Sequence, residues 1–135
     1  MGASAVALTG FAAWTLLLVL SIGMLRVSLV FTGRRAPNKF DPGGADVSDF
    51  SRRLCRAHAN CYENLPIFGA LIAVALGTGQ QSLTDDLAMI VLYLRIGQSL
   101  VHVASSSNPA VNLRFLLFLG QWGVMVVMAT RLLLA

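Results

Sequence analysis

Three polar side chains with complementary charge, Arg56, Asn60 and Glu63, lie four and three residues apart in the segment RAHANCYENLPIF. On an α-helix this spacing places them within about 60° of one another, so they form one stripe along one face. Arginine suits the carboxylates of a ligand, whereas a glutamate suits an ammonium group. The stripe therefore indicates binding of a small molecule that carries negative charge.

The chain that carries this stripe is unusually apolar. Of its 135 residues, 56% are hydrophobic and 12% are charged, whereas soluble domains have about 25% charged residues. This composition predicts an integral membrane protein. The net charge of +4 does not indicate nucleic-acid binding, because the basic residues lie mostly in one loop, where they set membrane orientation. We expect membrane lipids, and no nucleic acid, among its partners.

Apolar segments predict four transmembrane helices in a single domain over residues 1–135. Their expected ranges are about 5–31, 49–76, 84–104 and 110–134, and each is long enough to cross a bilayer, which needs about 20 residues. Pro66 lies inside the second helix and predicts a kink there. Cys55 and Cys61 are six residues apart on that helix, a spacing that predicts free buried thiols and neither a disulfide nor a metal site. The expected fold is an all-α, four-transmembrane-helix up-and-down bundle.

Basic residues are concentrated around the first loop. They are Arg34, Arg35, Lys39, Arg52, Arg53 and Arg56, whereas the second loop has no lysine or arginine. The positive-inside rule then predicts that the first and third loops are cytoplasmic and that both termini lie on the opposite side. In a bacterium this would be the inner membrane.

This topology gathers the other polar side chains near the stripe, in one leaflet. They are Arg26 and Arg34 from the first helix, Arg95, Gln98, Ser99 and His102 from one face of the third, and Arg114 from the start of the fourth. Arg26 is read either as a cation that reaches the headgroups or as one that faces a cavity. Glu63 is expected to face inward. Either it pairs with Arg56 or Arg95 and joins two helices, or the surplus arginines bind an anionic ligand.

The pattern R-A-x-x-N-x-x-E-x-x-P-x-F, here from Arg56 to Phe68, resembles the second-helix signature of the MAPEG superfamily, the membrane-associated proteins in eicosanoid and glutathione metabolism. The length resembles that of its short bacterial members. The resemblance implies a homotrimer with glutathione bound between neighbouring subunits. The glutathione-binding residues that it implies are Arg56, Asn60, Glu63, Arg95, His102, Gln98, His58, Arg34 and Arg26.

The same resemblance implies a glutathione S-transferase or peroxidase that acts on lipophilic electrophiles, with glutathione as co-substrate. Arg114 is then the residue expected beside the thiol, where a cation favours the reactive thiolate. Two departures from the pattern keep a non-catalytic glutathione- or lipid-binding scaffold open as an alternative. His102 stands where a tyrosine is usual, and Val111 and Asn112 stand where an arginine is usual. A small four-helix transporter is the third possibility. Those proteins carry a carboxylate in the first helix, whereas here the only charged residue of that helix is Arg26.

Overall fold

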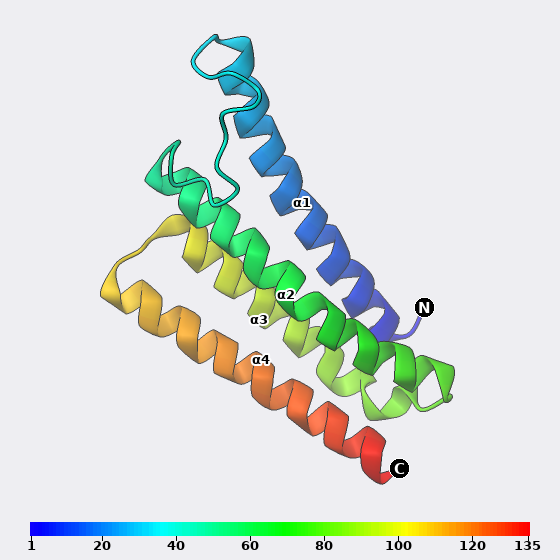
Figure 1. The fold of residues 1–135 in the computed structure, drawn as a ribbon. Helices are drawn as coiled ribbons and strands as arrows, with labels where there is room; N and C mark the ends of the chain where they lie inside the picture. Colours follow the sequence, from blue (N-terminus) through cyan, green and yellow to red (C-terminus); the bar gives the residue numbers. More distant parts are fainter.

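The computed structural model describes residues 1–135 and contains four long helices that alternate in direction. They are α1 (Ala3–Phe31), α2 (Asp49–Gly77), α3 (Asp85–Ala104) and α4 (Asn108–Leu134), with a short 3-10 turn, η1 (Gln81–Leu83), between α2 and α3. All four are long and apolar enough to cross a membrane. Figure 1 shows them side by side, with both chain termini at the same end of the bundle. The helices end within two residues of their expected ranges, and the all-helical class is confirmed.

Local signals explain where most of these helices begin and end. Ser48 caps α2 by accepting a hydrogen bond from the Ser51 backbone N–H at 3.0 Å, and Ser107 caps α4 through the Ala110 N–H at 3.4 Å. Gly33, with φ +69, ends α1, where the Gly33 and Arg34 amides return to α1 carbonyls. No such side-chain cap begins α3. α2 continues through Pro66 as a single helix.

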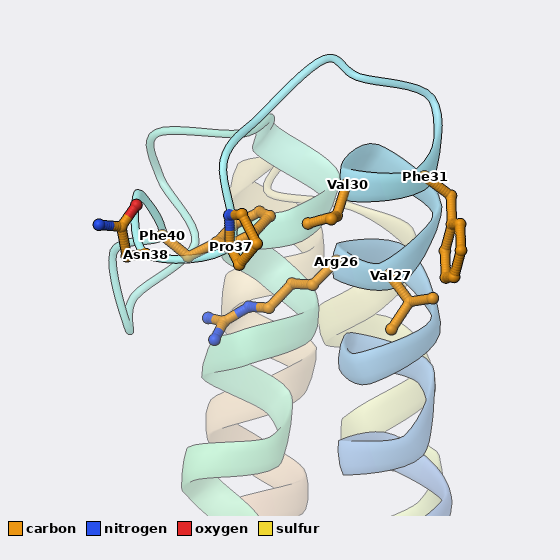
Figure 2. A pocket seen from close by; sticks show the side chains of 7 residues that line it. All are labelled: Arg26, Val27, Val30, Phe31, Pro37, Asn38 and Phe40. Atoms are coloured by element: carbon orange, nitrogen blue, oxygen red, sulfur yellow. The ribbon is translucent and has the colours of Figure 1, made fainter.

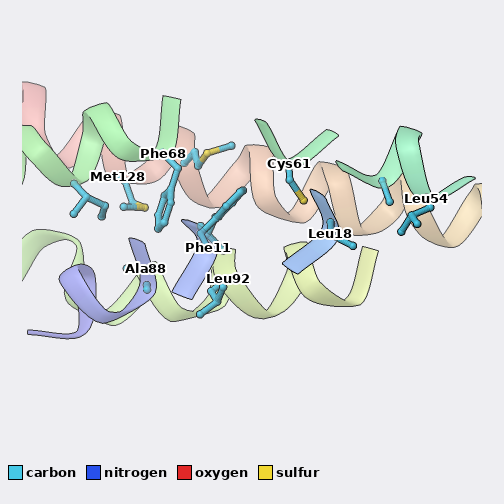
Figure 3. Packing of buried hydrophobic residues seen from close by; sticks show 13 residues of the cluster. Phe11, Leu18, Leu54, Cys61, Phe68, Ala88, Leu92 and Met128 are labelled. Carbon is cyan, nitrogen blue, oxygen red and sulfur yellow. The ribbon is translucent and has the colours of Figure 1, made fainter. Parts of the chain in front are cut away.

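The apolar core runs along the bundle, and most of its residues lie toward the end that holds the chain termini. Phe11 of α1 meets Phe68 of α2 with ring centroids 5.6 Å apart, and both rings pack in the cluster that Leu92 of α3 and Met128 of α4 complete (Figure 3). The buried residues of α1 end at Leu18, although the helix continues to Phe31. Beyond that point α1 leans away from the other helices (Figure 1). The two cavities of the molecule border this diverging half of α1.

The loop between α1 and α2 spans the divergence and has its own internal order. Arg35 forms an ion pair with Asp46, and the Arg26 and Arg35 guanidinium groups both lie over the Phe40 ring, at 5.4 and 5.6 Å from its centroid. The Asp41 backbone N–H donates to the Asp46 carboxylate at 3.1 Å. This hydrogen bond and the Arg35 charge hold the pKa of Asp46 below its usual value. The Asp46 interactions therefore stabilise the folded state fully at pH values above the unfolded-state pKa of the carboxyl. This stabilisation is lost as the pH falls through the lowered pKa of the folded state.

Gly44 holds this loop against α2 and permits a test of its packing. A Cβ at Gly44 would lie 2.9 Å from the Ser51 carbonyl oxygen and 2.8 Å from Cys55 Sγ, at a φ of +74. We predict that Gly44→Ala lowers the free energy of unfolding by about 2–4 kcal/mol, measured by titration with sodium dodecyl sulfate in detergent. Gly33→Ala is the matched control, because it has a similar φ of +69 with nothing within 4 Å, and it should cost only about 1 kcal/mol. Equal losses in the two variants would contradict the packing argument.

Candidate functional site

Three of the sequence-predicted site residues border one cavity where α1 diverges. The cavity has a volume of about 370 Å³ between α1, the α1–α2 loop and the first turns of α2. Its polar lining comes from Arg26, Arg56, His58 and Tyr62, together with the thiol of Cys55. The His58 and Tyr62 rings pack against each other with centroids 5.2 Å apart. Arg26 therefore faces a cavity, and its Nη2 also donates to the Asp41 carbonyl oxygen at 3.1 Å.

A second group joins α2 to the end of α3. Asn60 Nδ2 donates to His102 Nδ1 at 3.2 Å, and Arg53 Nε donates to the Val103 carbonyl oxygen at 2.9 Å. The α2 stripe and the polar face of α3 thus meet at His102.

Arg95 is the most buried charged residue of the chain. Its side chain is 1% exposed, and its guanidinium lies over the Phe11 ring at 5.6 Å from the centroid. Its Nε and Nη2 have no hydrogen-bond partner, and no carboxylate forms an ion pair with it. A buried cation without a partner is costly to hold, so the face-on Phe11 ring is the one favourable contact that the chain itself gives it.

A hydrogen-bonded pair of glutamines ties α3 to α4. Gln121 Nε2 donates to Gln98 Oε1 at 2.9 Å, and Gln98 Nε2 donates to the Arg114 carbonyl oxygen at 3.2 Å. Both glutamines are buried. The Nε of Arg114 is also buried and has no partner. The main chain of Arg114 is therefore fixed by α3, while its guanidinium keeps a free donor.

One expectation about Glu63 is wrong for the single chain, and one of the two alternatives for its partner does not hold there. Glu63 is exposed, not inward-facing, and it forms no ion pair with Arg56 or Arg95. Arg56 is seven residues away on the same outward face, about 10 Å along the helix axis, and Arg95 points into the bundle. Arg34 is also exposed, because α1 ends at Phe31 and leaves it in the loop.

Several residues near these sites were not selected from the sequence. Cys55 and Tyr62 are seven residues apart, and His58 lies between them at helical spacing, so the helix period contained the signal for this face. Gln121 was equally visible as the residue seven after Arg114. No sequence pattern predicted the contact between Phe11 and Arg95, because Phe11 belongs to a helix that is apolar on every side and so gives no direction for its faces.

The four-helix arrangement and the second-helix pattern agree with the comparison with known families. The MAPEG family model matches residues 4–134, almost the whole chain. The chain belongs to the MAPEG family. This family includes glutathione transferases and related proteins. No curated protein and no solved structure matches this MAPEG chain.

Replacing Arg95 tests whether its guanidinium contributes to the stability of this MAPEG fold. We predict that Arg95→Met leaves the free energy of unfolding unchanged or raises it by about 1 kcal/mol, because methionine removes two unsatisfied buried donors and keeps much of the volume. Arg131→Met is the control, since it breaks an exposed ion pair with Asp86 and should cost at most about 1 kcal/mol. Denaturant titration measures both. A loss above about 2 kcal/mol in Arg95→Met would show that the guanidinium is a structural element.

The glutamine pair between α3 and α4 is tested by a double-mutant cycle. We expect Gln98→Leu and Gln121→Leu to be coupled by about 0.6–1.7 kcal/mol, the range found for interhelical polar contacts in membranes. The four unfolding free energies are measured under one detergent condition. Additive effects of the two substitutions would mean that the hydrogen bond does not contribute to stability.

Proposed function

We propose that this MAPEG protein binds glutathione and uses it as co-substrate in a transferase or peroxidase reaction on lipophilic electrophiles. The observation that carries the proposal is that Arg56 and Glu63 are exposed and unpaired on one face of α2, where Arg56 also borders a cavity. Ionised groups at the edge of a membrane span are costly, about 2.5–3.5 kcal/mol on insertion scales, and such groups mark ligand sites by default. No structural ion pair accounts for their presence here.

The available charges match the chemistry of glutathione, which has two carboxylates, one ammonium group and a thiol. Arg56 and Arg26 border the same cavity and suit the carboxylates, and His58 lies beside them. Glu63 suits the ammonium group, and Asn60 and His102 supply hydrogen-bonding groups between α2 and α3. In this proposal Arg95 and Gln98 line the inner side of the site and Arg34 lies at its entrance.

The proposed chemistry is activation of the glutathione thiol. A thiolate is the nucleophile that attacks an electrophilic carbon or a peroxide oxygen, and a nearby cation lowers the thiol pKa by favouring the charged form. Arg114 is the candidate for this cation, because its buried Nε has no partner and its main chain is held by Gln98 on the polar face of α3. The glutamine pair would hold its backbone in register.

Assembly and orientation complete the proposal. Arg56 and Glu63 face away from the single chain, so a neighbouring copy is needed to remove them from lipid, and the family resemblance implies that three copies assemble. In this proposal the basic α1–α2 loop and the site beside it lie on the cytoplasmic side, as the positive-inside rule predicts.

A non-catalytic glutathione- or lipid-binding protein is the second candidate. It is favoured by the hydrogen bond between His102 and Asn60, because His102 occupies the position where a family tyrosine is expected and one ring nitrogen is already engaged. The ultraviolet absorbance of bound glutathione distinguishes the two functions. A thiolate band near neutral pH supports catalysis, and its absence with glutathione bound supports the scaffold.

Glu63→Gln tests the binding site directly. We expect it to reduce glutathione affinity at least about tenfold, because it removes the charge that would hold the ammonium group. The measurement is glutathione-induced thermal stabilisation of the detergent-purified protein, accompanied by turnover of a lipophilic electrophile.

Asp49→Asn is the matched control, since it removes an exposed carboxylate on the same helix that only pairs with Arg52. It should leave glutathione affinity unchanged. The oligomer size of each variant is followed by size-exclusion chromatography with light scattering. Loss of assembly in Glu63→Gln would assign the carboxylate a structural role, and wild-type protein with neither stabilisation nor turnover would overturn the proposed function.

A further inference from the structure

The larger cavity of the molecule is separate from the one just described and lies on the other side of Arg26. Its volume is about 450 Å³, and it is bounded by Val27, Val30 and Phe31 of α1 on one side and by Pro37 and Phe40 of the loop on the other. Figure 2 shows Arg26 extending from α1 beneath Pro37, with Val30 directed toward the loop. Asn38 also lines the cavity, which therefore combines mostly apolar walls with one amide and one cationic group.

The position of Arg26 along α1 places this cavity at the edge of the membrane. Arg26 is 23 residues after the start of the helix at Ala3, which is about 35 Å at 1.5 Å per residue. The hydrocarbon core of a bilayer is about 30 Å thick. The guanidinium thus reaches the depth of lipid phosphates, while Phe31 (87% exposed) and Val27 (49% exposed) form an open apolar edge.

The charges around the cavity are positive in excess. Arg26, Arg34 and Lys39 form no ion pair, whereas Asp46 is neutralised by Arg35. The remaining acid of the loop, Asp41, directs its carboxylate to the Gly43 N–H and offers Arg26 only its main-chain carbonyl oxygen. An anion at Arg26 would therefore meet unpaired positive charge.

We propose that this cavity binds an anionic glycerophospholipid of the surrounding bilayer. The phosphodiester lies against the Arg26 guanidinium, which has donors beyond the one given to Asp41, and an acyl chain lies along Val27 and Phe31. Guanidinium groups form strong charge-assisted hydrogen bonds with phosphate oxygens, and apolar walls select a ligand with a hydrocarbon chain over a free ion. The site shares Arg26 with the proposed glutathione site, but lipid binding can be measured without glutathione.

The test uses purified protein in detergent and phosphatidylglycerol that carries a diazirine on one acyl chain. After illumination, the labelled peptides are mapped by mass spectrometry, and glutathione is omitted throughout so that this result is independent of the proposed function. We expect labelling within residues 27–40, displaced about tenfold more effectively by unlabelled phosphatidylglycerol than by phosphatidylcholine of the same chain length. Arg26→Gln should reduce this labelling about tenfold.

Two further variants make the result decisive. Val30→Trp fills the cavity without changing charge and should reduce the labelling even if Arg26→Gln does not fold. Arg52→Gln removes a charge from an exposed arginine of α2 and should label as the wild type does. Equal displacement by the two lipids, or labelling unaffected by Val30→Trp, would overturn the proposal. Stronger displacement by inorganic phosphate or by oleate would assign the site to a free anion or a fatty acid instead.

Discussion

The polar face of α3 lies inside the bundle, and the other helices are arranged around it. Gln98 is hydrogen-bonded to α4, His102 to α2, and Arg95 is covered by Phe11 of α1. In a medium without water each of these groups needs a hydrogen-bond or cation–π partner within the protein. The packing of the other helices against α3 must therefore supply those partners. Two groups remain incompletely satisfied: Arg95, whose Nε and Nη2 have no acceptor, and Gln121, whose buried Oε1 accepts no hydrogen bond.

The polar groups that lack hydrogen-bond or ion-pair partners are not spread evenly over the molecule. At the end with the chain termini, Arg131 pairs with Asp86 and the Ser4 and Thr84 hydroxyls are hydrogen-bonded, whereas the buried Nε1 of Trp14 has no partner. At the loop end, Arg56, Glu63 and the buried Nε of Arg114 lack side-chain partners. The charged side chains that lack a partner on the α2 stripe and at the start of α4 therefore lie at the loop end of the bundle.

The helices and the polar face of α3 were predictable because both follow from periodicity. Arg95, Gln98, Ser99 and His102 recur at helical spacing, and all four are buried as a common face requires. Periodicity does not say which way a stripe faces, which is why Glu63 was expected inside and lies outside. It also gives no direction for α1, whose leucines and valines surround the helix, so neither its divergence nor the cavities beside it were visible in the sequence.

The length of α1 also relates to bilayer thickness. With 29 residues α1 is about 44 Å long, whereas α3, with 20 residues, is about 30 Å long and matches the hydrocarbon core. A helix longer than the core accommodates the mismatch by tilting. Because α2 also has 29 residues, unequal length does not by itself separate it from α1. The part of α1 beyond Leu18 has no buried residue, so it is the part that can tilt away from its neighbours, and the spaces beside Arg26 lie along it.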